Sequence, residues 1–106
     1  MFARNVSIHL KSNMLSDYTR TFEKDILPLL RKQNGFRDEI TFAGPGGVDV
    51  TAISLWENKT DAEAYNTNTY PEVLKTIARF IEGTPKVQTS DVVNSTFHKI
   101  AVHAAA

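Results

Sequence analysis

The order of apolar patterns along the chain constrains the fold more than any other feature of the sequence. Residues 2–10 alternate between an apolar set and a more polar set, a period of two that is typical of a β-strand. From Ser16 the apolar residues recur every three or four positions, which indicates an amphipathic helix that ends at Asn34-Gly35. Extended and helical patterns then follow again. The sequence predicts strands over 2–10, 36–43, 48–56 and 86–100, and helical regions over 16–34 and 60–82.

The order strand, helix, strand, strand, helix, strand predicts a ferredoxin-like α+β fold with a four-stranded antiparallel sheet. Right-handed crossovers put both helical regions on one face of that sheet. The other face stays bare, and a twofold-related copy is the usual way to bury its apolar residues. We therefore expect a single domain over residues 1–106, with a frayed tail over 101–106. We also expect a homodimer through the helix-free face, with residues 86–100 reaching the partner's edge.

Local signals predict where the helical regions break. Pro28 lacks an amide donor, so the first helix should kink or restart around residues 25–27. Capping-box spacings begin at Thr60 and at Thr69, which predicts that the second helical region is split in two. The segment Gly83-Thr84-Pro85 should end it.

Composition and spacing argue against several classes of partner. Twelve Lys and Arg balance twelve Asp and Glu and are scattered, so nucleic acid is not expected. The chain has no cysteine and no apolar run near the roughly 18 residues of a membrane span, and we expect a cytoplasmic protein without a membrane partner. The glycines of 44–47 fit a tight turn better than a phosphate-binding loop, because no Lys-Ser/Thr pair follows them.

Four stretches of the sequence together resemble one protein family. They are residues 34–36, the run Ile53-Ser54-Leu55-Trp56-Glu57-Asn58-Lys59, the run Ala62-Glu63-Ala64-Tyr65, and residues 87–89. With the hairpin between 36 and 56, they resemble the antibiotic biosynthesis monooxygenase (ABM) family of dimeric α+β barrels. The resemblance implies the fold more strongly than an activity. It points to cofactor-free oxygenases of aromatic polyketides or quinols, and also to haem-degrading enzymes.

The haem-degrading relatives fit the sequence less well. Asn5 matches their strand-one asparagine, but Tyr65 stands where they have a pocket tryptophan. The stretch 70–77, which should carry their axial histidine, contains none, although Tyr65, Tyr70 or His9 remain as substitute ligands. We therefore expect no cofactor.

The cofactor-free reading requires a base that ionises a phenol or quinol, and an apolar cavity that excludes water. His9 is a candidate base, because imidazole titrates near neutrality, and Asn5 and Ser7 share its strand face. The predicted catalytic residues are His9, Asn5 and Tyr65, and the predicted substrate-binding residues are Ser7, Trp56, Asn66, Tyr70 and Arg79. No metal site is expected, since His98 and His103 do not match His9 in any known ligand spacing.

Plainer interpretations of these residues remain open. The polar face of the first strand is typical of a solvated surface, and Trp56 at a strand-to-helix junction is typical of a core plug. Tyr65 and Tyr70 fit a pocket gate or a structural role equally well. The alternative function is a non-enzymatic dimer that binds a small molecule in the same cavity, which we expect within each protomer under its own helices.

Overall fold

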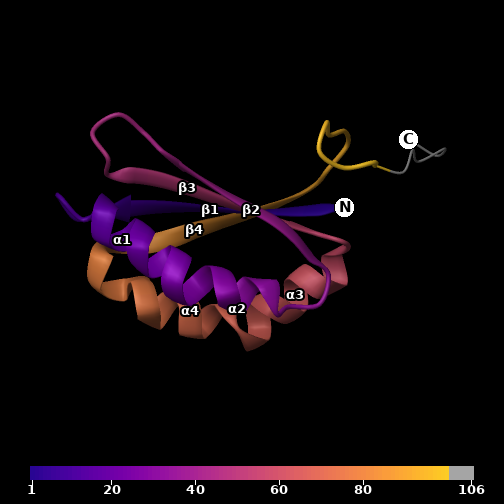
Figure 1. The fold of residues 1–106 in the computed structure, drawn as a ribbon, viewed down its shortest axis with the longest axis horizontal. Coiled ribbons are helices and arrows are strands. Elements are labelled where there is room, and N and C mark those ends of the chain that lie inside the picture. Colours follow the sequence, from indigo (N-terminus) through magenta and orange to yellow (C-terminus); the bar gives the residue numbers. More distant parts are fainter. Residues whose placement is uncertain (101–106) are drawn as a thin grey trace.

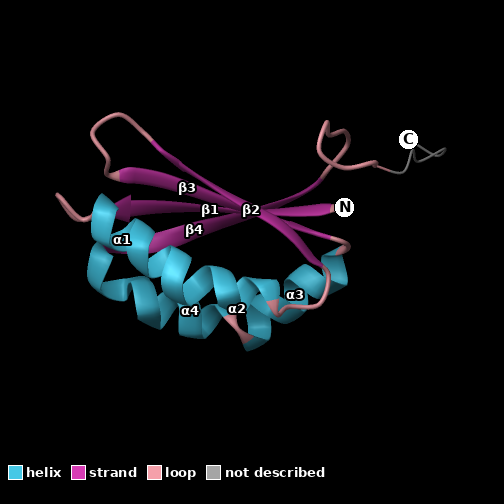
Figure 2. Cartoon of the chain, in the orientation of Figure 1, coloured by secondary structure: helices cyan, strands magenta, loops and turns pink. Residues whose placement is uncertain are grey.

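The chain folds as a four-stranded antiparallel sheet with all its helices on one face. The computed structural model describes residues 1–100, and its element order is β-α-β-β-α-β (Figures 1 and 2). The sheet order is β2-β3-β1-β4, which confirms the predicted ferredoxin-like α+β fold. The strands are β1 (Phe2–Leu10), β2 (Phe36–Ala43), β3 (Asp49–Trp56) and β4 (Ile81–Asp91).

Strand β1 lies at the centre of the sheet and sets its two faces. Its even-numbered residues are buried beneath the helices, whereas its odd-numbered residues point to the helix-free face. β1 pairs with β3 on one side, where Val6 faces Ala52, and with β4 on the other, where Val6 faces Val87. The sequence pattern of period two therefore translates directly into one covered and one uncovered face.

The first helical region restarts at the predicted place. It comprises α1 (Leu15–Thr21), a π-helical turn (Phe22–Ile26) and α2 (Leu27–Arg31). The amide of Leu27 donates to the carbonyl of Phe22, five residues back, so the turn is wider than in an α-helix. Pro28 then occupies the first turn of α2, where a missing amide donor costs nothing.

The second helical region breaks at Thr69, as predicted, into α3 (Lys59–Asn68) and α4 (Tyr70–Ile77). The two predicted capping boxes are wrong. Asn58, not Thr60, caps α3, and its Oδ1 accepts from the amide of Asp61 at 3.0 Å. Thr69 precedes α4, but its side chain caps no amide there; its hydroxyl donates to Gln33 Oε1 at 3.2 Å, in the segment that follows α2.

The last strand begins earlier and ends earlier than predicted. A short 3₁₀ turn (Ala78–Phe80) closes the helical region, and β4 runs over Ile81–Asp91 rather than 86–100. Gly83 has φ of 72° and lies inside the strand, where the register against β1 shifts between Ser7 and His9. A glycine at an irregular strand position resembles a helix stop in sequence, since both need a positive φ. Residues 92–100 form no strand, and the predicted frayed tail (101–106) lies outside the described residues.

The core fills the space between the sheet and the helices. Six side chains are almost completely inaccessible: Leu10, Tyr18, Ile26, Val50, Trp56 and Ile77. They come from two strands and from both helical regions, so burial of these groups holds the helices on the sheet. None of the helices in the described part of the chain is long and apolar enough to cross a membrane.

Candidate functional site

A row of three polar residues crosses the helix-covered face of the sheet. The strand registers pair Glu39 of β2 with Ser54 of β3, and Ser54 with Arg4 of β1. Arg4 is 3% exposed and Ser54 is 7% exposed, and they are the only buried polar side chains among residues 1–100. The row lies in an otherwise apolar interior, where a polar group costs free energy unless it is hydrogen-bonded.

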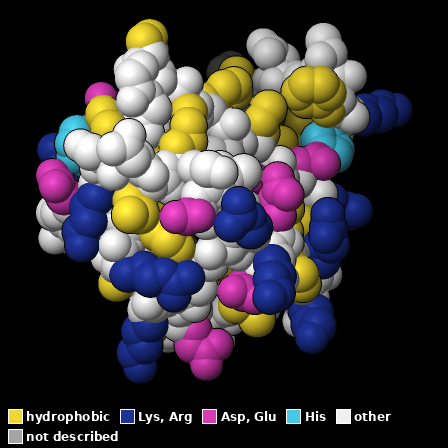
Figure 3. Space-filling view, turned by 60° about the vertical axis from the view of Figure 1, so that its left-hand side comes forward, with side chains coloured by type: hydrophobic (Ala, Val, Ile, Leu, Met, Phe, Trp, Pro, Cys, Tyr) yellow, Lys and Arg dark blue, Asp and Glu magenta, His cyan; other side chains and the backbone are white. Residues whose placement is uncertain are grey.

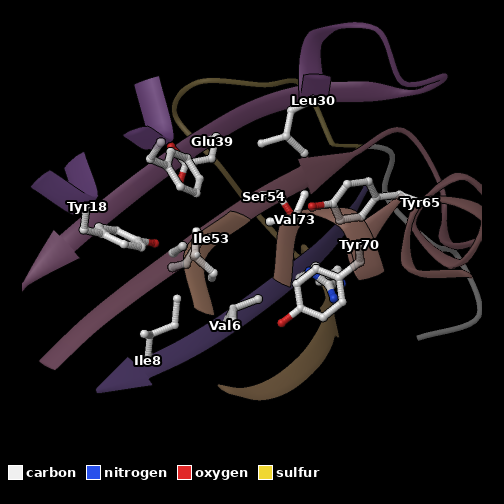
Figure 4. A pocket seen from close by; sticks show the side chains of 14 residues that line it. Val6, Ile8, Tyr18, Leu30, Glu39, Ile53, Ser54, Tyr65, Tyr70 and Val73 are labelled. Atoms are coloured by element: carbon white, nitrogen blue, oxygen red, sulfur yellow. The ribbon is translucent and has the colours of Figure 1, made fainter. Parts of the chain in front are cut away.

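A narrow cavity lies above this row, between the sheet and the helices. Arg4, Glu39 and Ser54 line it, with Tyr18, Tyr65 and Tyr70 from the helices, and the rest of its wall is mostly aliphatic and aromatic (Figure 4). The centre of a water molecule has about 30 Å³ available in it. A volume of that size holds a few water molecules at most, so a larger ligand requires part of the wall to move.

Part of this wall also faces an outer groove between α1 and β2. Tyr18, Phe22 and Glu39 line both the inner cavity and this groove, which offers about 390 Å³ by the same measure. These three side chains are therefore the partition between the two spaces. Strand β2 is an edge strand and Phe22 begins the π-helical turn, so the partition is built from elements with few neighbours on one side.

Arg4 is held at one end of the cavity by polar and aromatic contacts. Its Nη2 donates to Asn66 Oδ1 at 2.8 Å. Its guanidinium carbon lies 4.0 Å from the ring centroid of Tyr70 and 5.2 Å from that of Tyr65. Cation–π contacts of this kind offset part of the cost of burying the charge. Among the described residues no carboxylate forms an ion pair with Arg4.

Two tyrosine hydroxyls at the cavity are buried without a hydrogen-bond partner in the described structure, those of Tyr18 and Tyr70. Such an unsatisfied group typically costs about 1–3 kcal/mol. Burial raises the pKa of both, and it raises the pKa of Tyr65 to about 12, although nearby Arg4 opposes the change at Tyr65 and at Tyr70. These phenols are therefore protonated at neutral pH and offer hydrogen-bond donors to the cavity.

Glu39 is the titratable acid of the cavity. Burial raises the pKa of its carboxyl above the ordinary value, and the hydrogen bond that Thr41 Oγ1 donates to Oε2, at 2.6 Å, lowers it in part. A carboxylate whose pKa moves towards neutrality is a better proton acceptor than one at the surface. Figure 4 shows Glu39 beside Tyr18, on the side of the cavity away from Tyr70.

Comparison with solved structures identifies the fold. A monooxygenase from the gene ActVA-Orf6 of Streptomyces coelicolor, in complex with nanaomycin D, matches with a TM-score of 0.76 and 14% identity over 92% of each chain. SnoaB, a cofactor-independent oxygenase from Streptomyces nogalater, matches with a TM-score of 0.74 and 7% identity over 90% of this chain and 95% of its own. An antibiotic biosynthesis monooxygenase matches with a TM-score of 0.69 and 11% identity over 89% of this chain and 100% of its own.

The chain has the ABM fold. The resemblance predicted from the sequence is thereby confirmed at the level of the fold. A comparison of the sequence with models of protein families found no match, and neither did a comparison with curated proteins. Structural similarity at such low sequence identity does not show a shared activity, so the function has to be argued from the cavity.

The cavity of this ABM fold brings together only some of the residues predicted from the sequence. Tyr65 and Tyr70 line it, and Asn66 holds Arg4. Trp56 lies behind the wall: its Nε1 donates to Ser54 Oγ at 2.9 Å, and its ring centroid is 5.0 Å from that of Tyr65. Trp56 therefore positions two cavity residues without reaching the cavity itself.

The expectation that Asn5, Ser7 and His9 face this cavity needs correction. They occupy odd positions of β1, so the alternation of the strand directs them to the helix-free face. His9 Nδ1 lies 2.8 Å from Asp49 Oδ1, and the His9 side chain is half exposed. Arg79 is also exposed and lies over the ring of Phe80, outside the cavity.

The sequence interpretation missed Arg4, Glu39, Ser54 and Tyr18. A signal existed for Arg4, because it is the single charged residue in the apolar phase of β1. Glu39 gave no such signal, since β2 is an edge strand whose polar residues follow no clean alternation. The part of the chain that the structure describes contains no group of three or more His, Asp or Glu side chains that could hold a metal ion.

Proposed function

We propose that the protein is a cofactor-independent, monooxygenase-like enzyme that acts on a small aromatic hydroxyl compound, of the quinol or phenolic polyketide type. The observation that carries the proposal is the apolar cavity with Glu39 and unsatisfied tyrosine hydroxyls in its wall. Two proteins of the same fold support the choice, one solved with nanaomycin D and one named as a cofactor-independent oxygenase. The ligand nanaomycin D and the name oxygenase belong to those two proteins. For this chain we infer only the class of substrate.

The chemistry begins with ionisation of the substrate. Glu39 accepts the proton as the O–H bond breaks, and the electron pair left behind is shared between oxygen and ring. An electron-rich ring carbon that carries a hydrogen then forms a C–O bond with dioxygen to give a hydroperoxide. Loss of that hydrogen as a proton and cleavage of the O–O bond release water and leave a carbonyl, so the substrate is oxidised to a quinone and dioxygen is the oxidant. The hydroxyls of Tyr18 and Tyr70 are donors available to the oxygen anions that form. The apolar wall keeps water away from them.

Oxygen consumption with a panel of quinols and hydroxylated aromatics tests this function. We expect uptake with at least one compound, and a fall of about a hundredfold in Glu39→Gln, because removal of a general base commonly costs that much. Glu72→Gln is the matched control, since Glu72 is exposed in the first turn of α4. No uptake with any compound would overturn the proposal in favour of the non-enzymatic binder.

His9→Ala separates the base chosen here from the base chosen on sequence grounds. His9 lies on the helix-free face, so we expect the rate of oxygen uptake to be unchanged. A rate that falls in His9→Ala but not in Glu39→Gln would move the reaction to the other face of the sheet.

We further propose that the protein is a homodimer through the helix-free face. Ile40 and Phe42, which are 49% and 52% exposed, lie on this face. In the strand register Ile40 is opposite Ile53, so apolar residues on this face extend from β2 to β3. Figure 3 shows apolar side chains gathered towards the sheet side of the molecule, and charged side chains of both signs mixed over the helical side. A second copy of the same face matches a surface of this kind.

A further inference from the structure

The charge of Arg4 is the feature of the cavity that the proposed reaction does not use. A guanidinium has five N–H donors. In the described structure one of its nitrogens, Nη2, donates a hydrogen bond to a side chain, Asn66. No carboxylate among residues 1–100 pairs with it, and the side chain is almost completely buried. A buried charge in this state is strongly unfavourable unless something compensates it.

The surroundings of Arg4 favour a planar partner. The rings of Tyr65 and Tyr70 both lie against the guanidinium, and their centroids are 6.1 Å apart with the planes inclined by 47°. The hydroxyl of Tyr70 is buried and lacks a partner, so a second donor is available near the cation. Two aromatic walls and two kinds of donor suit a flat ring that carries a negatively charged oxygen.

Glu39 does not supply the missing negative charge. Ser54 separates Glu39 from Arg4 in the strand register, so their backbones are two strand spacings apart, about 10 Å. The cavity is therefore positive at the Arg4 end and weakly acidic at the Glu39 end.

We propose that Arg4, together with the hydroxyl of Tyr70, is an anion subsite, and that the cavity takes a planar aromatic compound bearing one anionic oxygen group, a phenolate or a carboxylate. The inference deepens the proposed function, since it names the ligand class of the same cavity. The planar guanidinium offers paired N–H donors that match a carboxylate or a phenolate oxygen, which a lysine would not.

Calorimetric titration of the wild-type protein with charged and neutral partners of the same shape tests the inference. Benzoate is compared with benzamide, and 4-nitrophenolate with 4-nitroanisole, and inorganic phosphate reports on anions without a ring. We expect at least one aromatic anion to bind about tenfold more tightly than its neutral partner and than phosphate. Equal affinity within each pair, phosphate binding as tightly as the aromatic anions, or no saturable binding would overturn the inference. The two pairs also separate a carboxylate ligand from a phenolate ligand.

Arg4→Met removes the charge and keeps a flexible side chain of similar length. Arg31→Met is the matched control, since Arg31 is exposed in α2 and does not line the cavity. We expect the preference for the anion to disappear in Arg4→Met and to persist in Arg31→Met; a preference that survives in Arg4→Met contradicts the inference. If Arg4→Met fails to fold, Tyr70→Phe keeps the ring and should still weaken anion binding several-fold, and unchanged binding there removes the subsite. Anion binding without oxygen uptake would leave the subsite in place and remove only the oxygenase.

Discussion

At the scale of single residues, Tyr18 is the clearest case of a side chain that both stabilises and destabilises the fold. Its ring is completely buried and packs against Phe22 and Phe80, with centroids 5.8 and 6.3 Å away. Its hydroxyl is buried without a partner in the described structure. The ring therefore stabilises the core, while the oxygen costs stability that a hydrogen-bonding group in the cavity would return.

We expect Tyr18→Phe to be as stable as the wild type or more stable by about 1 kcal/mol, because it removes an unsatisfied hydroxyl and keeps the ring. Urea denaturation measures the difference. Trp56→Phe is the contrasting variant, since Trp56 Nε1 has a partner in Ser54 Oγ and its loss should destabilise the fold. A clearly less stable Tyr18→Phe would mean that the hydroxyl is satisfied in solution, for instance by water.

Glu39 gives a second residue-scale prediction, in the pH dependence of stability. Burial raises the pKa of Glu39 in the folded state, so the folded protein holds this proton more tightly than the unfolded chain. Its contribution to stability is complete below the unfolded pKa and is lost as pH rises through the folded pKa. We expect Glu39→Gln, which cannot ionise, to raise the melting temperature by a few degrees near neutral pH and much less at about pH 4. Thermal melts of both proteins that differ equally at the two pH values would contradict this.

Sequence patterns predicted the identity of the cavity residues only in part, and the reason is visible residue by residue. Tyr65 and Tyr70 were identified because they flank a helix break that Thr69 and Pro71 indicated in the sequence. Asn5 and His9 were chosen for their chemistry, although the alternation of β1 puts them on the face opposite its apolar residues. Chemical type alone does not assign a side chain to a face, whereas the phase of the strand does.

At the scale of elements, β1 and β2 lie over the predicted residues and β3 begins one residue later than predicted, whereas both ends of β4 differ from the prediction. The prediction for β1 succeeded because Arg4 is the single charged residue in its apolar phase. The start of β4 was missed, because Gly83 in a strand and a glycine after a helix require the same backbone conformation. Both capping boxes were predicted wrongly, because residue spacing does not show which side chain accepts the amide hydrogen bond: Asn58 caps α3, and the Thr69 hydroxyl contacts Gln33.

The link between α2 and β2 carries the element-scale prediction. Gly35 has φ of 74°, and a Cβ there would collide with the side chain of Asp61 in α3. Gly46 also has a positive φ, of 90°, but a Cβ there meets nothing within 4 Å. We expect Gly35→Ala to lower the free energy of unfolding by about 2–3 kcal/mol and Gly46→Ala by about 1 kcal/mol. Equal losses of unfolding free energy in the two variants, measured by urea denaturation, would mean that the Asp61 side chain moves aside at little cost.

At the scale of the whole molecule, the two faces of the sheet are given different tasks in our proposals. The covered face carries the cavity, and the uncovered face carries Ile40 and Phe42. The order of elements predicted this division, since the crossover rule decides which face the helices cover. The width of the cavity and the partition formed by Tyr18 and Phe22 were beyond prediction, because they depend on how side chains from four elements pack together.

Light scattering coupled to gel filtration tests the proposed dimer. We expect the wild type to have twice the mass of the 11.8 kDa chain at micromolar concentration. Phe42→Lys places a charge on the apolar part of the helix-free face and should shift the protein to the single-chain mass. Thr67→Lys adds the same charge on the exposed surface of α3 and should not. A wild type of single-chain mass would show the helix-free face to be unpaired in solution.

The alternation of β1 also limits how this chain can change over evolutionary time. Arg4 and Asn5 are neighbours in sequence but belong to opposite sides of the sheet. Inserting or deleting one residue near the start of the strand would exchange every side chain beyond it between the cavity and the outer surface. Substitutions in β1 can adjust the cavity and the outer surface independently, whereas a change of length damages both at once. Homologous chains should therefore vary in residue type along this strand and keep its length constant.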